Sequence, residues 1–127
     1  MTINSIIGTY KRNIPNLKIL ECDPKLLSYF EGISLEKYII HRDIKEIIKA
    51  DFSHINVKEL NLFKNLKKIQ LGAFDSISFI IIRCYLHHIK YLNKSIISFI
   101  NLLNDDQDTI YSNTFENFIN LKLVILP

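Results

Sequence analysis

Cysteine and histidine stand close together at one point of the 127-residue sequence, in the run Cys84-x-x-His87-His88. Thiolate and imidazole are ligands that zinc prefers, and a structural zinc site usually combines two such pairs in a tetrahedron. The other candidate ligands are scattered and form no second pair: Cys22, His41 and His54. We therefore expect no metal site here, and we interpret the run as a buried thiol beside partly exposed imidazoles.

The triplet His41-Arg42-Asp43 is the one with which a protein-kinase catalytic loop opens, where the aspartate takes the proton of the substrate hydroxyl. That loop also needs an asparagine five residues after the aspartate, and Ile48 occupies the position. No glycine-rich loop or strand lysine motif precedes the triplet. A solvated helix start, with Asp43 near the N-cap, explains the same residues.

The acidic run Asp105-Asp106-Gln107-Asp108 has Glu116 at the twelfth position, as a calcium-binding loop would. Such a loop needs glycine at its sixth position for a sharp turn, and the sequence has Ile110 there. The run therefore predicts a solvated loop and not a calcium site.

The signatures of nucleophilic catalysis and of nucleotide binding are missing. There is no G-x-S-x-G, and the three glycines stand alone, so that no phosphate-binding loop can form. We predict that the protein is not an enzyme and carries no cofactor. An enzyme of unfamiliar type stays an alternative, which a deep pocket holding a histidine beside a carboxylate would favour.

The composition is dominated by residues with AT-rich codons, with 24 Ile, 13 Lys and 12 Asn. The net charge of +3 therefore reflects genomic base composition, and lysine outnumbers arginine 13 to 3 although arginine is the better phosphate ligand. Binding to nucleic acid or another anionic surface through the lysines is the second hypothesis. Tyrosine beside cations, at Tyr10-Lys11-Arg12 and at Tyr85 near Lys90, could stack on bases.

The length predicts one domain over residues 1–127, with 48% apolar residues to form its core. The N-terminus has no secretory pattern, and no apolar run reaches the roughly 18 to 20 residues of a membrane span. The two cysteines, Cys22 and Cys84, lie far apart in the sequence and do not make a disulfide framework. We predict a cytoplasmic protein without a transmembrane segment.

A short apolar motif recurs along the chain and predicts parallel strands. Its form is L-x-x-L-x-L, in which alternate residues point to one face of a sheet. The starts are unevenly spaced, and the matches are Leu17/Leu20/Cys22, Leu35/Tyr38/Ile40, Val57/Leu60/Leu62, Leu66/Ile69/Leu71, Ile77/Ile80/Ile82 and Leu121/Val124/Leu126. The starts at Val57 and Leu66 are too close for each to carry a full repeat, so either one of them is a chance match or the two belong to a hairpin-like excursion.

The last segment, residues 114–127, resembles the BspA-like leucine-rich repeat. The positions that match that repeat are Phe115, Phe118, Leu121, Val124, Leu126 and Pro127. The resemblance implies a short, curved, solenoid-like α/β domain with a mostly parallel sheet and flanking helices. In that family an irregular leading region precedes the regular repeats, so the chain could be the first part of a longer array.

Three segments between the strands predict helices. Pro24–Phe30 is followed by Gly32, a helix stop. Asp43–Lys49 has apolar residues on one helical face, and Leu86–Leu103 has them at a spacing of three and four residues over several turns.

Together these features predict a non-catalytic scaffold that binds a protein partner of unknown identity. The strand residues that do not enter the core would form an exposed polar face. The candidates for this face are Lys18, Glu36, Lys37, Glu59, Asn61, Lys67, Lys68, Gln70 and Lys122.

Overall fold

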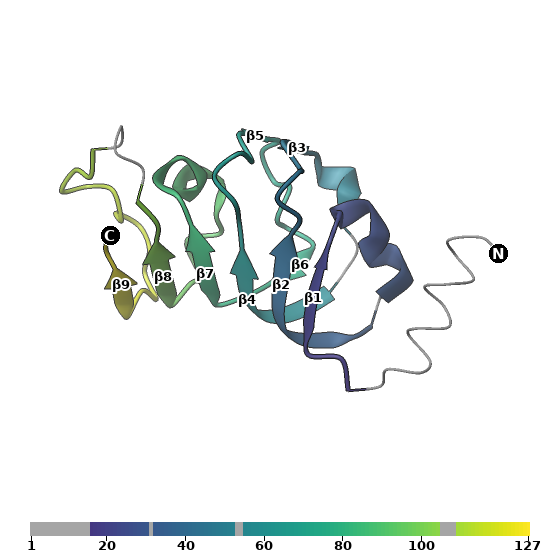
Figure 1. Cartoon of the computed structure of the whole chain (residues 1–127). Helices are drawn as coiled ribbons and strands as arrows, with labels where there is room; N and C mark the ends of the chain where they lie inside the picture. Colours follow the sequence, from purple (N-terminus) through teal and green to yellow (C-terminus); the bar gives the residue numbers. More distant parts are fainter. Residues whose placement is uncertain (1–15, 31, 53–54, 105–108) are drawn as a thin grey trace.

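A computed structural model of the chain describes residues 16–30, 32–52, 55–104 and 109–127. Strands lie side by side in the main sheet (Figure 1), in the order β1-β2-β4-β7-β8-β9, with β6 beside the start of β4. The strands of this sheet are β1 (Ile19–Cys22), β2 (Ser34–Ile40), β4 (Ile55–Asn61), β6 (Ile77–Ser78), β7 (Ile81–Cys84), β8 (Phe99–Leu102) and β9 (Leu123–Ile125). A second sheet pairs β3 (Glu46–Ile47) with β5 (Lys68–Ile69).

Every pairing between these strands is parallel, so the predicted α/β class with a mostly parallel sheet is confirmed. The step along the chain between paired residues of the main sheet ranges from 18 residues, between Ile19 and Lys37, to 24, between Phe99 and Leu123. In the second sheet Glu46 pairs with Lys68 at a step within this range. The chain therefore returns to a neighbouring position about once every twenty residues. In the main sheet Ile19 pairs with Lys37, Lys37 with Glu59, Glu59 with Ile81, Ile81 with Phe99, and Phe99 with Leu123.

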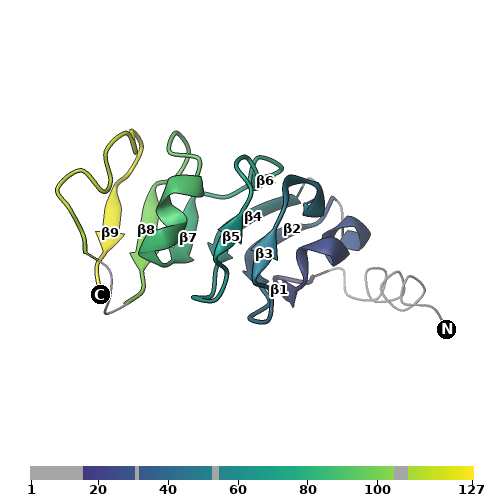
Figure 2. The same ribbon diagram turned by 90° about the horizontal axis from the view of Figure 1, so that it is seen from above.

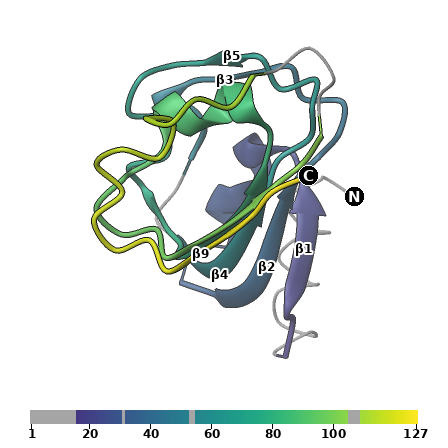
Figure 3. The same ribbon diagram turned by 90° about the vertical axis from the view of Figure 1, so that its left-hand side faces the viewer.

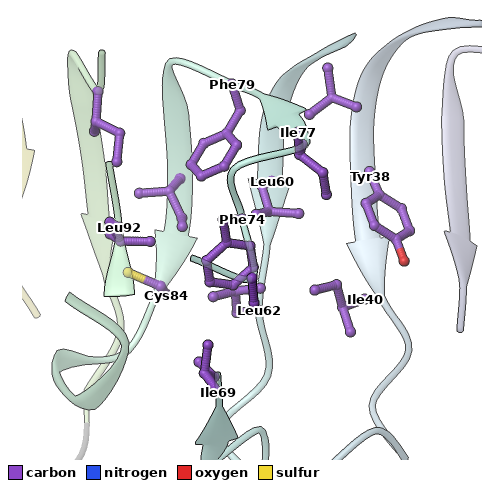
Figure 4. Packing of buried hydrophobic residues seen from close by; sticks show 14 of the residues in the cluster. Tyr38, Ile40, Leu60, Leu62, Ile69, Phe74, Ile77, Phe79, Cys84 and Leu92 are labelled. Atoms are coloured by element: carbon purple, nitrogen blue, oxygen red, sulfur yellow. The ribbon is translucent and has the colours of Figure 1, made fainter. Parts of the chain in front are cut away.

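Three rows of side chains cross the sheet and form its core. Tyr38, Leu60 and Ile82 are aligned by the strand register and are each 0% exposed. Figure 4 shows Tyr38 and Leu60 among the packed side chains of the core. Burying one such side chain contributes about 1.5–3 kcal/mol, so the stacked rows stabilise the packing of neighbouring strands. The three rows are Leu35, Val57, Phe79 and Ile97; Tyr38, Leu60, Ile82 and Ile100; and Ile40, Leu62, Cys84 and Leu102.

The rows correct the predicted strand register in one place. The motif was assigned to Ile77, Ile80 and Ile82, but Ile80 is 48% exposed, whereas Phe79, Ile82 and Cys84 are buried. The match at Leu66 is not in the main sheet, because its strand β5 pairs with β3. The motifs at Val57 and Leu66 can thus follow each other closely because they belong to different sheets.

The helical segments are short and of the 3₁₀ type. Segment η1 (Pro24–Phe30) has the predicted bounds and is followed by Gly32 at a φ of +84°. The predicted helix over 86–103 is wrong: η3 (Leu86–Tyr91) covers its first third, and β8 occupies its end. The predicted helix over 43–49 is wrong as well, because β3 forms there and η2 (Lys49–Asp51) follows. No helix in the described ranges is long and apolar enough to cross a bilayer.

The second sheet lies across the interior from the main sheet. Figure 3 shows β3 and β5 on the side opposite β2 and β4, and Figure 2 shows η3 next to β5 on that side. Side chains link successive passes of the chain there: the Asn65 amide donates to the Arg42 carbonyl, and the Asn120 amide donates to the Ser95 carbonyl. These bonds satisfy carbonyls outside the strand ladders.

The register leads to a prediction about two neighbouring isoleucines. Replacing Ile82 by alanine removes a fully buried side chain and should lower the free energy of unfolding by about 2–5 kcal/mol. Replacing Ile80 by alanine, the matched control, should change it by less than about 0.5 kcal/mol. Urea denaturation monitored by circular dichroism measures both values, and a larger loss for Ile80→Ala would show that the register is wrong.

Candidate functional site

The side of the main sheet that faces away from the core is the outer face. Strand alternation and register place two rows of side chains on it. The first row is Ile19, Lys37, Glu59, Ile81, Phe99 and Leu123, and the second is Glu21, Ile39, Asn61, Arg83, Asn101 and Ile125. Phe63, Tyr85 and Leu103 continue the face just beyond the strand ends, and each is half-buried.

The outer face mixes charged and apolar groups. Lys37 and Glu59 form an ion pair of 3.3 Å between neighbouring strands, with both side chains partly exposed. Ile81 and Phe99 follow in the same row and are half-buried, while Leu123 is 48% exposed. Contiguous apolar surface with polar neighbours is typical of interaction sites. The face therefore offers both hydrophobic contact and charge to a partner.

The structure brings together only some of the predicted face residues. Lys37, Glu59 and Asn61 lie next to one another on β2 and β4. Lys18, Glu36 and Lys122 belong to an exposed row at the starts of the strands, where the Glu36 N–H donates to the Lys18 carbonyl at 2.8 Å. The assumption of one shared face is wrong for the remaining three, which lie on or beside β5 in the second sheet: Lys67, Lys68 and Gln70.

Several residues of the outer face were missed by the sequence reasoning. Ile81, Arg83 and Tyr85 fell in a mis-registered segment, and Phe99 and Asn101 fell in the predicted long helix. The signal that could have found the first two is the step between paired strands, which is the same from β2 to β4 as from β4 to β7. The step from β2 to β4, repeated from Glu59 and Asn61, leads to Ile81 and Arg83.

The side chains of the run Cys84-x-x-His87-His88 are used in packing and hydrogen bonding within the fold, and they do not form a metal-binding site. Both ring nitrogens of His88 are occupied: Nδ1 accepts the Tyr85 N–H at 3.0 Å, and Nε2 donates to the Leu66 carbonyl at 2.8 Å. His87 Nε2 lies 3.1 Å from the same carbonyl oxygen. The Cys84 side chain is 0% exposed in the core. The three side chains therefore do not converge on one open point.

Neither thiol is poised for chemistry. Both cysteines are free, and burial raises the pKa of Cys22 to about 11 and that of Cys84 to about 12. A thiol acts as a nucleophile or metal ligand in its deprotonated form, which is scarce at neutral pH with these values. Among the described residues no group of three or more His, Cys, Asp and Glu side chains gathers that could hold a metal ion.

The other segments that the sequence analysis considered for catalysis or binding lie at the surface or outside the described residues. His41 Nδ1 accepts the Asp43 N–H at 3.1 Å and lies 3.6 Å from an Asp43 carboxylate oxygen, so the two form a local turn at the surface. Arg42 lies over the Phe63 ring at 5.5 Å from its centroid. Tyr10–Arg12, His54 and Asp105–Asp108 lie outside the described residues.

No protein-family model matches the sequence, and neither the curated proteins nor the solved structures give a match.

The buried His88 predicts a loss of stability in mild acid. Burial, with a further contribution from His87, lowers the pKa of His88 from 6.5 to about 4, while the bond to the Leu66 carbonyl opposes the shift. The unfolded chain binds a proton here before the folded chain does, so stability is fully present above about pH 6.5 and falls as the pH drops to about 4. The loss over this window should be about 3 kcal/mol.

Urea denaturation at pH 7 and pH 4.5 measures this loss. His88→Gln is the control, because a glutamine can still donate to the Leu66 carbonyl but does not titrate. It should be less stable at neutral pH but clearly less sensitive to acid than the original chain. Equal pH dependence in the two proteins would show that His88 is not responsible.

Proposed function

We propose that the chain is a non-catalytic scaffold of the leucine-rich-repeat type, which binds a protein partner through the outer face. The repeat assignment is supported by the step between paired strands, which comes close to the roughly 20–29 residues of leucine-rich repeats. It is also supported by the recurrence of three buried positions on or just outside each of the strands β2, β4, β7 and β8. In residues 114–127, Phe118 is buried and Leu121 and Val124 pack against the core, in keeping with the BspA-like resemblance.

The observation that carries the proposal is the composition and exposure of the outer face. Its apolar members are held at the surface by strand alternation, since the opposite side of each strand is already used by the core. Strands in a sheet also hold their side chains in a fixed array. Such an array can recognise a partner surface without a deep pocket and without reacting groups.

The charge pattern favours a protein partner over nucleic acid. Charges of both signs lie on and beside the outer face, including Glu21, Glu36 and Glu59 among the cations. Lys37 is already paired with Glu59. Nucleic acid is usually bound by a stripe of one sign. The two free thiols are compatible with the reducing, cytoplasmic setting that we include in the proposal.

Charge reversal on the two sheets tests this assignment. Lys37→Glu/Arg83→Glu changes the outer face, and Lys67→Glu/Lys68→Glu makes the same change in net charge on the second sheet. The original chain and both variants are used as bait in nuclease-treated lysate. We expect the outer-face variant to lose at least tenfold of the specifically captured protein, and the second-sheet variant to retain it.

Each other result has a definite meaning. Equal losses in both variants, together with binding that falls steeply with salt or disappears with nuclease, would support the nucleic-acid alternative. A loss only in the second-sheet variant would move the interaction to the surface around β5. Circular dichroism and the urea midpoint of each variant establish that it is folded.

A further inference from the structure

Two hollows adjoin at the ends of strands β2, β4 and β7, which are neighbours in the main sheet (Figure 1). Phe63 and Tyr85, on two neighbouring passes of the chain, line both hollows. The smaller hollow, of about 200 Å³, extends from these residues to Arg83 and Leu103, and the larger, of about 420 Å³, extends to Arg42. We call the two hollows together the aromatic groove.

The side chains of the aromatic groove are held in place by other parts of the chain. The Tyr85 ring lies against the His87 ring, with 6.1 Å between the centroids, and the Tyr85 N–H donates to Nδ1 of the buried His88 at 3.0 Å. The Arg42 guanidinium lies over the Phe63 ring, 5.5 Å from its centroid. Ligand sites are typically apolar, largely pre-formed and supplied with a few polar groups that set orientation. The aromatic groove has these properties.

The groove is positively charged. It contains two of the three arginines of the chain, Arg42 and Arg83, which are both exposed and make no ion pair with a described residue. Lys64 also lines it, and the one acid among its lining residues is Asp43, whose carboxylate lies 3.6 Å from His41 Nδ1. An arginine fork binds a carboxylate with two parallel hydrogen bonds. The complementary ligand is therefore an apolar group with carboxylates near it.

The positions of the two arginines set the spacing of these carboxylates. Arg83 lies on β7, and Arg42 follows β2, two strand positions away, which corresponds to about 10 Å across the sheet. In an extended peptide, the residues two before and two after a central residue lie about 13 Å apart, on the same side as that residue. The long arginine and glutamate side chains span the difference. A peptide with the order acid-x-apolar-x-acid thus matches the groove.

We propose that the protein partner binds the aromatic groove with an acidic peptide segment of this order, which places its large apolar side chain in the smaller hollow and its two carboxylates on Arg42 and Arg83. This proposal deepens the scaffold function and rests on it. The arginines select acidic sequences. The hollow beside Phe63 and Tyr85 selects a side chain such as leucine or phenylalanine.

A peptide fits the groove better than single-stranded nucleic acid, which also combines negative charge with flat apolar groups. Bases bind by stacking on open aromatic rings. Here Arg42 already lies over the Phe63 ring, and Tyr85 is stacked against His87. The trinucleotide of thymidylate tests this choice. If it binds more tightly than the peptide probe described next, the peptide proposal is overturned, whereas weaker binding supports it.

The test uses the full ¹⁵N-labelled chain and the pentapeptide acetyl-Glu-Ser-Phe-Ser-Glu-amide as the probe. Titration followed by NMR should shift the backbone resonances of Phe63, Arg83 and Tyr85, with saturation in the millimolar range. A peptide with glutamine in place of both glutamates, and one with alanine in place of phenylalanine, should each bind at least fivefold more weakly. Absence of shifts at these residues throughout the millimolar range, or equal affinity of the three peptides, would overturn the proposal.

Arg42→Gln/Arg83→Gln removes both positive charges and should lower the affinity for the probe at least tenfold. Lys18→Gln/Lys122→Gln is the matched control, because it removes two exposed positive charges at the opposite ends of the strands, and it should leave the affinity within twofold. Equal losses in the two variants would show that the peptide responds only to net charge, which would overturn the groove as its site. The urea midpoint establishes that each variant is folded. Should the arginine variant fail to fold, Arg83→Gln alone serves in its place, with an expected loss of at least threefold.

The bait experiment distinguishes this proposal from the scaffold function. A partner that is lost with Lys37→Glu/Arg83→Glu but retained by Arg42→Gln/Arg83→Gln would support the scaffold and overturn the groove as its anchor. A partner that is lost with both variants, and is displaced from the original chain by the pentapeptide, supports both proposals. Capture of no partner, with the pentapeptide bound as expected, would overturn the scaffold function and support the groove as a peptide site.

Discussion

The structure depends on a ladder of parallel backbone hydrogen bonds between strands that are far apart in the sequence. Even the shortest steps between paired residues of the described main-sheet strands, such as Ile19 to Lys37, span 18 residues. A parallel pair cannot be joined by a tight turn, so every strand must be followed by a return segment that crosses to the other side of the molecule. Each pass then has about twenty residues in which to form a strand, two corners and a return.

The small number of residues between paired strands explains why the described return segments contain only short 3₁₀ helices. Ile81 of β7 pairs with Phe99 of β8, so the rest of β7, both corners and the return must fit between these two positions. A helix over 86–103 would use all of that chain and leave no residues to pair with β7. The apolar spacing in that segment was therefore a combination of two signals, a short helical turn with Ile89 and Leu92 and a strand with Ile100.

At the corners, backbone carbonyls that are not paired within a sheet need hydrogen-bond donors from elsewhere. Side chains one pass further along the chain supply them, as Asn65 does for Arg42 and His88 does for Leu66. A histidine in this position must stay neutral, because a charged imidazole would be buried. The same constraint makes a zinc-like sequence pattern a structural one, because the Nε2 atoms of His87 and His88 lie against the Leu66 carbonyl of the preceding pass.

The sequence allowed the parallel α/β class and four strand motifs, at Leu17, Leu35, Val57 and Leu121, to be predicted, together with Lys37, Glu59 and Asn61 on the outer face. It did not allow the strands at Phe79 and Ile97 to be found. In a chain with 40 Ile and Leu residues, a shift of two positions preserves strand alternation, and only pairing with a neighbour distinguishes the two registers. The missing strands also concealed the half of the outer face that contains Arg83 and Phe99.

The outer face differs from the rest of the molecule in what its residues are required to do. The core rows are determined by packing and the corners by hydrogen bonding, but no described element covers the outer face. The Asn61 amide oxygen has no hydrogen-bond partner among the described residues, which is unfavourable for folding by about 1–3 kcal/mol relative to a satisfied oxygen. An apolar residue at position 61 would avoid that cost and would fit a row that already contains Ile39 and Ile125. Asn61 is therefore a local departure from the most stable choice at the centre of the sheet.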